Sequence, residues 1–169
     1  VYKRQTNFFR ANETVYMVMG YESGRSLQDH ILRRRDKGEK PLVSERFIRK
    51  MFSHVMNGLR EVHTNKLLHL DLKPANIYLR VDGTPILLDF GAARQTLQSD
   101  MPKLYPMYTP GFAAPELYVK NGSLGPWTDI YSIGASMFAC MVGAPPQPAD
   151  QRKLNDKMDG HFNRLEGVY

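Results

Sequence analysis

The chain has almost no cysteine and no long uninterrupted hydrophobic run. Its 169 residues include a single cysteine, Cys140, so no disulfide can form within the chain. We expect this thiol to be buried as a small apolar side chain in a protein of a reducing compartment. The longest apolar passage, residues 130–144, contains serine and glycine and is shorter than the roughly 20 residues that span a bilayer. Without a recognisable signal peptide, these features favour a cytoplasmic location and no membrane segment.

Acidic residues are too few to balance the basic ones. Lys and Arg number 23 against 17 Asp and Glu, which gives a formal net charge of +6, and much of the excess lies in residues 33–40 and 46–50. A basic cluster can bind a polyanion. No basic motif with interleaved aromatic residues appears, however, so we interpret the cluster as a solvated face around a helix pair and expect no nucleic-acid partner. The apolar fraction of 42% and charged fraction of 24% indicate a folded domain or part of one.

Two kinds of local pattern predict secondary structure in the first 65 residues. Residues 8–10 and 14–19 are rich in β-branched and aromatic side chains around a polar turn, which indicates a β-hairpin. Ser26 followed by Asp29 resembles a helix start, and a short helix should end in the basic run. A longer amphipathic helix should begin at Ser44, since apolar residues recur every three or four positions. These are Phe47, Ile48, Met51, Phe52, Val55, Met56, Leu59 and Val62.

The second half of the chain has weaker periodicity. Residues 77–81 and 84–88 predict two short strands around an Asp-Gly turn. The stretch 92–108 has little pattern and suits an exposed loop. A buried helix should follow from residue 128 and stop at the Gly-Ala-Pro-Pro of residues 143–146, and one more helix is expected near residues 151–158.

The stretch from residue 69 to residue 91 carries the chemistry. Residues 69–76 read His-Leu-Asp-Leu-Lys-Pro-Ala-Asn, and residues 89–91 read Asp-Phe-Gly. Asp71 offers a carboxylate that can accept a hydroxyl proton, while Asn76 and Asp89 offer oxygen ligands for a hard cation. The predicted hairpin between them would bring Asn76 and Asp89 together. These groups suit phosphoryl transfer.

The order of these motifs resembles the protein-kinase family. That family couples a His-x-Asp-Leu-Lys-x-x-Asn loop to Asp-Phe-Gly and then to Ala-Pro-Glu, which residues 114–116 supply. The resemblance implies that Asp71 takes the proton of the acceptor hydroxyl and that Lys73 offsets charge on the transferring phosphate. It also implies that Asn76 and Asp89 hold Mg²⁺ beneath ATP. Asp129, in a run that is similar to the start of the family's central helix, would anchor the backbone of residues 69–76.

The resemblance extends to the nucleotide site. Residues 16–22 look like the family's last small-lobe strand running into its hinge. Met19 would be the gatekeeper, and the carbonyl of Gly20 and the N–H of Glu22 would face the adenine edge. Tyr78 would form part of the adenine floor. Gly20 stands where the family often has a glutamate, which loosens the hinge without removing its backbone contacts.

The implied fold is α+β and protein-kinase-like, with a mainly helical large lobe and a short remnant of the small-lobe sheet. We expect a partial kinase domain over residues 1–169, divided into the end of the small lobe (1–19), the hinge (20–26) and an incomplete large lobe (27–169). Thr109 accompanies serine/threonine specificity in the family, so protein serine and threonine hydroxyls are the implied acceptors. The sequence of residues 71–77 and 89–94 is most similar to that found in the bacterial branch of eukaryotic-type serine/threonine kinases.

The sequence departs from the family pattern in several places. Leu70 replaces the arginine that usually pairs with a phosphorylated loop, which implies weaker dependence on loop phosphorylation. The family's glycine-rich loop and strand lysine do not occur in these residues, so we expect a fragment that has little turnover by itself. No partner for Glu116 can be identified from the sequence.

Two other functions compete with the kinase interpretation. A small-molecule phosphotransferase of the aminoglycoside or choline type has a similar order of catalytic Asp, Asn and Asp residues. Lys73, the Asp-Phe-Gly motif and the Ala-Pro-Glu motif favour a protein substrate instead. A pseudokinase or interaction scaffold would have no need of three polar groups in an apolar setting. Loss of activity on changing Asp89 would separate an enzyme from a scaffold.

Overall fold

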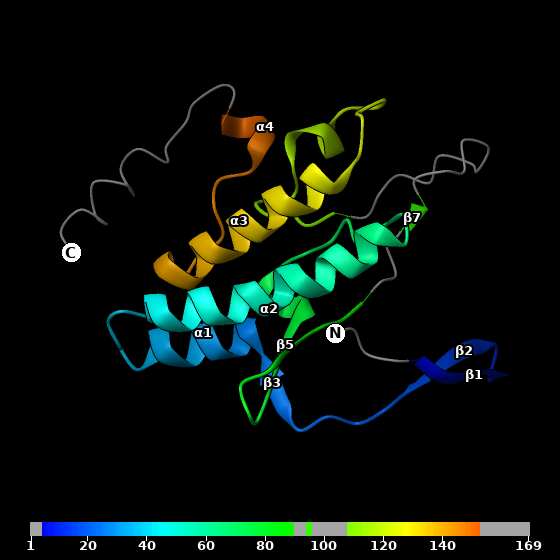
Figure 1. The fold of residues 1–169 in the computed structure, drawn as a ribbon, viewed down its shortest axis with the longest axis horizontal. Coiled ribbons are helices and arrows are strands. Elements are labelled where there is room, and N and C mark those ends of the chain that lie inside the picture. Colours follow the sequence, from blue (N-terminus) through cyan, green and yellow to red (C-terminus); the bar gives the residue numbers. More distant parts are fainter. Residues whose placement is uncertain (1–4, 90–93, 96–107, 153–169) are drawn as a thin grey trace.

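A β-hairpin comes first in the chain. In the computed structural model, which describes residues 5–89, 94–95 and 108–152, strands β1 (Gln5–Ala11) and β2 (Thr14–Met19) pair antiparallel. Asn12 and Glu13 between them have φ angles of 49° and 57°, and positive φ at both turn residues matches the twist of the paired strands. The hairpin stands apart from the helices (Figure 1). The predicted pair of strands is confirmed, with a longer first strand.

Two serine-capped helices form the main body. The hydroxyl of Ser26 accepts a hydrogen bond from the Asp29 N–H at 3.0 Å at the start of α1 (Leu27–Asp36). Ser44 caps α2 (Glu45–Thr64) in the same way through the Phe47 N–H at 3.4 Å. Each cap satisfies an N–H that the first helical turn leaves without a partner. Both predicted helices are confirmed, and they lie side by side (Figure 1).

A three-stranded antiparallel sheet lies beside these helices. Its order is β3 (Gly24–Ser26), β5 (Ile77–Arg80) and β6 (Pro85–Leu87), so β5 is central. β5 and β6 form the predicted hairpin, with Gly83 at a φ of 81° in its turn. The Leu88 N–H donates to the carbonyl of Asn76 at 2.9 Å and extends this pairing. The sheet therefore links the segment before α1 to the residues that flank the central loop (residues 69–76).

The remaining elements surround the central loop. β4 (Leu67–Leu68) pairs with β7 (Arg94–Gln95), and the 3₁₀ helices η1 (Pro74–Asn76) and η3 (Pro115–Tyr118) are short. α3 (Pro126–Val142) ends at Gly143, which adopts the left-handed conformation common after helices. α4 (Ala149–Arg152) contains the first residues of the last predicted helix, and the rest of that prediction lies outside the described residues.

The core is built on the apolar face of α2. Its side chains pack with α1, with the β5–β6 hairpin and with α3. The fully buried members include Leu27, Met51, Phe52, Leu59, Leu72, Ile77 and Leu87. Met56 differs from the sequence prediction because it lies at the edge of the apolar stripe and is 45% exposed. The rest of that stripe is buried or half-buried as expected.

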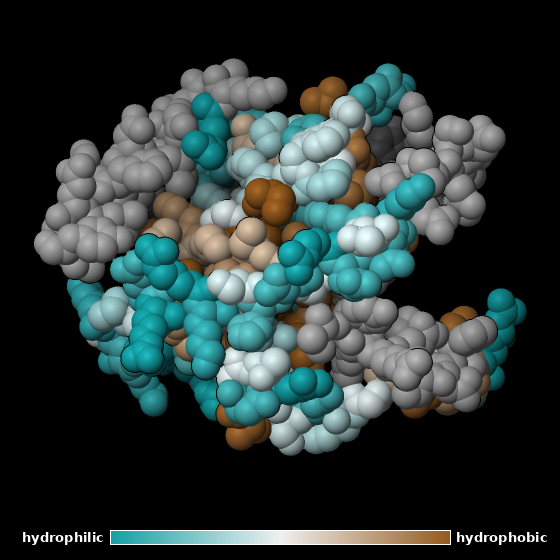
Figure 2. Space-filling model, in the orientation of Figure 1, coloured by the Kyte–Doolittle hydropathy of each residue, from teal (hydrophilic) through white to brown (hydrophobic). Residues whose placement is uncertain are grey.

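Basic residues gather around the α1–α2 turn. Residues 33–50 contain eight Arg and Lys against three acidic residues, and hydrophilic side chains dominate this part of the surface in Figure 2. Glu39 pairs with Arg34 at 2.8 Å, and Glu45 pairs with Arg49 at 2.6 Å. The cluster is largely exposed, as a solvated face requires, and the interpretation that it binds no polyanion stays a prediction. In the described ranges, no helix has the length and apolar character needed to cross a membrane.

Candidate active site

The central loop is anchored by a buried carboxylate from a distant helix. Asp129, in the first turns of α3, has no exposed surface. Its Oδ1 accepts the Leu70 N–H at 2.8 Å, and its Oδ2 accepts the His69 N–H at 2.9 Å. Leu70 has a φ of 64°, an uncommon conformation for a branched side chain, and these bonds hold it there. The predicted anchoring role of Asp129 is confirmed.

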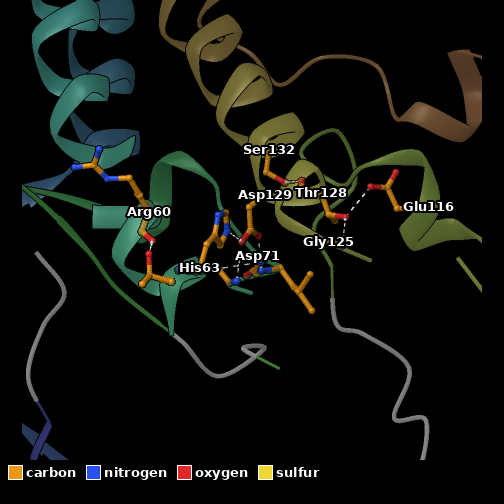
Figure 3. A network of polar contacts seen from close by, with 11 residues as sticks. Arg60, His63, Asp71, Glu116, Gly125, Thr128, Asp129 and Ser132 are labelled. Atoms are coloured by element: carbon orange, nitrogen blue, oxygen red, sulfur yellow. Dashed lines mark hydrogen bonds and ion pairs between the residues drawn. The ribbon is translucent and has the colours of Figure 1, made fainter. Parts of the chain in front are cut away.

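His63 joins the same anchor. Its Nε2 lies 2.8 Å from Asp129 Oδ2, and Figure 3 shows the two side chains pointing toward each other from α2 and α3. A carboxylate accepts hydrogen bonds, so Nε2 donates. No functional role for His63 is predicted from the sequence. Its one local signal was its position one turn after Leu59 on the buried side of α2, which does not reveal a partner 66 residues away.

His69 is buried and neutral in this arrangement. Its Nε2 lies 3.0 Å from the carbonyl oxygen of Leu88, which can only accept, so Nε2 carries the proton. Nδ1 then accepts the Asp71 N–H at 3.4 Å. Burial lowers the pKa of His69 below its ordinary value, which agrees with a neutral ring. The imidazole thus ties the central loop to the strand that leads to Asp89.

Asp71 and Lys73 lie together with Thr109. Lys73 Nζ is 2.8 Å from Asp71 Oδ2 and donates to Thr109 Oγ1 at 2.7 Å. The Thr109 hydroxyl in turn donates to Asp71 Oδ1 at 2.8 Å. All three residues are half-buried, so the Asp71 carboxylate and the Lys73 ammonium remain partly accessible to solvent. The structure therefore brings together the two predicted reactive groups and a hydroxyl.

Asn76 completes the central loop. Its Nδ2 donates to the Asp71 carbonyl at 2.8 Å and to Asp71 Oδ2 at 3.2 Å. Because both bonds use the nitrogen, the side-chain oxygen of Asn76 is left for another cationic or donor group. Pro74 begins η1, and the tight turn of η1 directs the Asn76 side chain back to Asp71.

Asp89 is placed next to Asn76 by the β5–β6 hairpin. The bond from the Leu88 N–H to the Asn76 carbonyl brings the two backbones together, and Asp89 follows with an exposed side chain and a φ of 58°. Within the described ranges, no group of three or more His, Cys, Asp or Glu side chains could hold a metal. A set of one carboxylate and one amide oxygen fits Mg²⁺, which usually takes its other ligands from water and phosphate.

The residues assigned to the nucleotide site lie at the end of β2, in the segment that follows it and in β5. Met19, which is 45% exposed, ends β2, Gly20 comes directly after it, and Glu22 is half-buried. The Tyr78 hydroxyl donates to the Glu22 carbonyl at 3.0 Å, so the proposed adenine floor and the predicted hinge are in contact. Glu22 also forms an ion pair with Arg80, a residue that the sequence analysis did not single out.

Glu116 has a partner that the sequence did not reveal. Its Oε1 accepts the Thr128 hydroxyl at 2.7 Å, and Thr128 Oγ1 accepts the Gly125 N–H at 3.2 Å (Figure 3). Thr128 is fully buried at the start of α3, next to Asp129. The Ala-Pro-Glu motif is therefore attached to the same helix that anchors the central loop. Phe90 and most of the predicted exposed loop lie outside the described residues.

Known proteins with similar sequences are protein kinases. The protein kinase domain model matches residues 4–166. The probable serine/threonine-protein kinase MARK-C of Dictyostelium discoideum is 30% identical over 156 residues, which cover 92% of this chain and 19% of that protein. The mitogen-activated protein kinase pmk-3 of Caenorhabditis elegans is 31% identical, with 81% of this chain and 29% of that protein covered.

Two further similarities add to this picture. The inactive serine/threonine-protein kinase PLK5 of Mus musculus is 31% identical over 91% of this chain and 25% of its own length. A solved structure, the PpkA-294 apo form, superposes with a TM-score of 0.73 at 31% identity, covering 92% of this chain and 52% of that one. The chain spans less than a third of each of these curated relatives and about half of that structure.

The family model covers nearly the whole chain, and the structural superposition extends over most of it. The α+β arrangement is the protein-kinase-like fold that the sequence predicts. From its sequence match and its fold together, the chain belongs to the protein kinase domain family.

Proposed function

We propose that this chain contributes the large-lobe part of an enzyme that transfers the γ-phosphoryl group of ATP to serine or threonine hydroxyls of proteins. Members of the protein kinase family generally use ATP and Mg²⁺. The observation that carries the proposal is the contact among Asp71, Lys73 and Thr109. A hydroxyl already donates to Asp71 there, with a cation beside it.

Asp71 suits the role of the group that orients the acceptor and takes its proton. Its carboxylate accepts a hydroxyl at 2.8 Å, within the distance at which a general base acts. The Asn76 amide and the Lys73 ammonium hold the carboxylate in place. An incoming serine or threonine hydroxyl would lie where the same carboxylate can accept it.

Lys73 suits the role of charge compensation. Phosphoryl transfer passes through a loose transition state, so the protein contributes mainly positioning and electrostatic stabilisation. Lys73 Nζ lies 2.8 Å from Asp71 Oδ2 and 2.7 Å from Thr109 Oγ1, directly beside the proposed acceptor position. A cation at this point would stabilise negative charge that develops on the transferred group.

Asn76 and Asp89 would hold Mg²⁺, which would neutralise charge on the nucleotide phosphates. The chain's own contribution is to keep these two side chains on adjacent backbone. The β5–β6 pairing and the Leu88 to Asn76 hydrogen bond do this. The proposed assignment to a bacterial branch and the proposed serine/threonine substrate rest on the sequence resemblance, and the proposed cytoplasmic location rests on the composition, with its single cysteine.

The proposal is tested by magnesium-dependent transfer from labelled ATP. The full-length gene product, whatever its extent, is assayed on itself and on a basic peptide that contains serine and threonine. Asp71→Asn and Asp89→Asn are each expected to lower transfer about a hundredfold or more, because the proton acceptor or a metal ligand is lost. Asp36→Asn is the matched control, since Asp36 is exposed on α1 and far in sequence from the site.

The outcomes separate the proposal from its alternatives. Transfer that disappears in the first two variants and persists in Asp36→Asn supports a working kinase. A folded full-length protein with no transfer would favour a scaffold. Transfer to aminoglycosides or choline in place of the peptide would favour a small-molecule phosphotransferase.

A further inference from the structure

The connector between β2 and β3 (residues 20–23) has little packing of its own. Gly20 is exposed, and outside its chain neighbours no atom lies within 4 Å of the point where a Cβ would stand. The next residue, Tyr21, is 89% exposed. A short segment with exposed side chains and a glycine samples many conformations unless something holds it. Glu22 is the half-buried residue of this connector, so its contacts determine where the connector lies.

Glu22 is held by two side chains from β5. Arg80 Nε lies 3.0 Å from Glu22 Oε2, and Arg80 Nη2 lies 2.9 Å from Oε1, which is a bidentate guanidinium–carboxylate pair. The Tyr78 hydroxyl donates to the Glu22 carbonyl at 3.0 Å. The side chains of Arg80 and Glu22 are 31% and 34% exposed. Bidentate geometry fixes direction as well as distance, so both the side chain and the backbone of Glu22 are constrained.

The placement of these contacts follows from the sheet. Tyr78 and Arg80 are two residues apart on β5, so their side chains project from the same face. β3 pairs with β5 so that Gly24 lies opposite Arg80 and Ser26 lies opposite Tyr78. The Val81 N–H also donates to the Ser23 carbonyl at 3.2 Å. The backbone that follows Glu22 is therefore already in register with the strand that holds Glu22.

We propose that Tyr78 and Arg80 are positioning residues that hold Glu22 and thereby pre-organise the connector backbone for the nucleotide. This inference rests on the proposed function and on the expectation, from the family resemblance, that the Glu22 N–H faces the adenine edge. Arg80 acts through Glu22, with which it forms the bidentate pair. The contacts offset the freedom that Gly20 introduces two residues earlier. Because pre-organisation lowers the entropy lost on binding, it strengthens nucleotide binding without changing the chemical step.

The pair is electrostatically robust. The side-chain hydrogen bonds with Glu22 raise the pKa of Arg80 above its ordinary value, so the guanidinium remains charged. The contact is partly exposed, and exposed ion pairs contribute modestly even when their geometry is good. The expected effects are therefore moderate changes in affinity.

The test uses the full-length gene product and substitutions that keep the strand intact. Arg80→Gln and Glu22→Gln should each raise KM for ATP about three- to tenfold and leave kcat within about twofold. The lost contact stabilises the bound substrate and the transition state equally, so only binding is weakened. Tyr78→Phe keeps the ring and removes the hydroxyl, so a smaller rise of about two- to fivefold is expected. The double variant Glu22→Arg with Arg80→Glu restores opposite charges and should return KM toward the original value. Arg25→Ala, a change of an exposed arginine on β3, is the matched control.

A second readout does not depend on catalysis. Amide hydrogen exchange of residues 20–23, measured without nucleotide, should be several-fold faster in Arg80→Gln than in the unaltered protein or in Arg25→Ala. Unchanged exchange and unchanged KM in Arg80→Gln would overturn the inference while leaving the proposed function in place. A fall in kcat with unchanged KM would also overturn it. Absence of nucleotide binding in the unaltered protein would instead overturn the proposed function.

Discussion

Cys140 shows how far burial controls the chemistry of one side chain. It lies in α3 with no exposed surface, and burial raises the pKa of its thiol to about 12. Near pH 8 the thiolate would then be about one part in ten thousand of the thiol. The reactive form is both scarce and enclosed.

The native thiol should therefore resist an aromatic disulfide reagent at pH 8 for as long as the core stays closed. In urea above the unfolding midpoint the same thiol should react within seconds to minutes, because it gains access and its ordinary pKa. Absorbance of the released thiolate measures both rates, and free glutathione is the reagent control. Since the chain has a single cysteine, the signal has one source. Rapid reaction of the folded protein would contradict the burial described for α3.

At the scale of single elements, β3 depends on close approach of two backbones. A Cβ built at Gly24 would lie 2.0 Å from the Leu79 carbonyl oxygen, and a backbone atom cannot move away without disturbing β5. Gly24→Ala should therefore lower the free energy of unfolding by about 2–4 kcal/mol, the range of severe overpacking. Urea denaturation with a fluorescence readout measures the change.

Gly20→Ala is the matched control for that prediction. Outside its chain neighbours, Gly20 has no atom within 4 Å of its Cβ position, and its φ is not in the left-handed range. The alanine should change stability by no more than about 1 kcal/mol, with a small gain from a less flexible unfolded chain. Equal effects of the two substitutions would show that the β3–β5 approach is not what Gly24 provides.

At the scale of the whole molecule, we predict that the 169-residue polypeptide alone has little or no turnover. Its sequence contains no Gly-x-Gly-x-x-Gly motif, and the nucleotide phosphates would be held chiefly by Lys73 and by a metal on Asn76 and Asp89. Positioning of the phosphates supplies most of the rate in phosphoryl transfer, so a nucleotide held by these contacts alone should react very slowly. ATP turnover is compared with that of the full-length gene product, and an Asp71→Asn version corrects for contaminating kinases. Comparable rates would refute the prediction.

Elements with a local signal could be predicted from the sequence. α2 has an apolar stripe and a serine cap, the β5–β6 hairpin has an Asp-Gly turn, and both were found where expected. Asp71, Lys73 and Asn76 could also be placed near one another, because they lie within six residues of chain. In each case the information is contained in a short window.

Contacts between distant segments could not be predicted. Glu22 and Arg80 are 58 residues apart, and His63 and Asp129 are 66 apart. Neither pair leaves a periodic signal, since a single polar residue on a helix or strand is compatible with many partners. The Thr128 partner of Glu116 was missed for the same reason, because it depends on how η3 packs against the start of α3. The placement of the Thr109 hydroxyl on Asp71 likewise requires the folded chain.

Asp129 also limits how this sequence can change. One carboxylate serves α2 through His63 and the central loop through the N–H groups of His69 and Leu70, and it belongs to α3. Asparagine would replace one acceptor oxygen with an NH₂ group that faces other donors. Glutamate would add a methylene group at a position where the side chain is fully buried. Any single substitution of Asp129 therefore breaks at least one of its contacts with His63, His69 and Leu70. We expect this position to stay aspartate while other residues of the central loop vary.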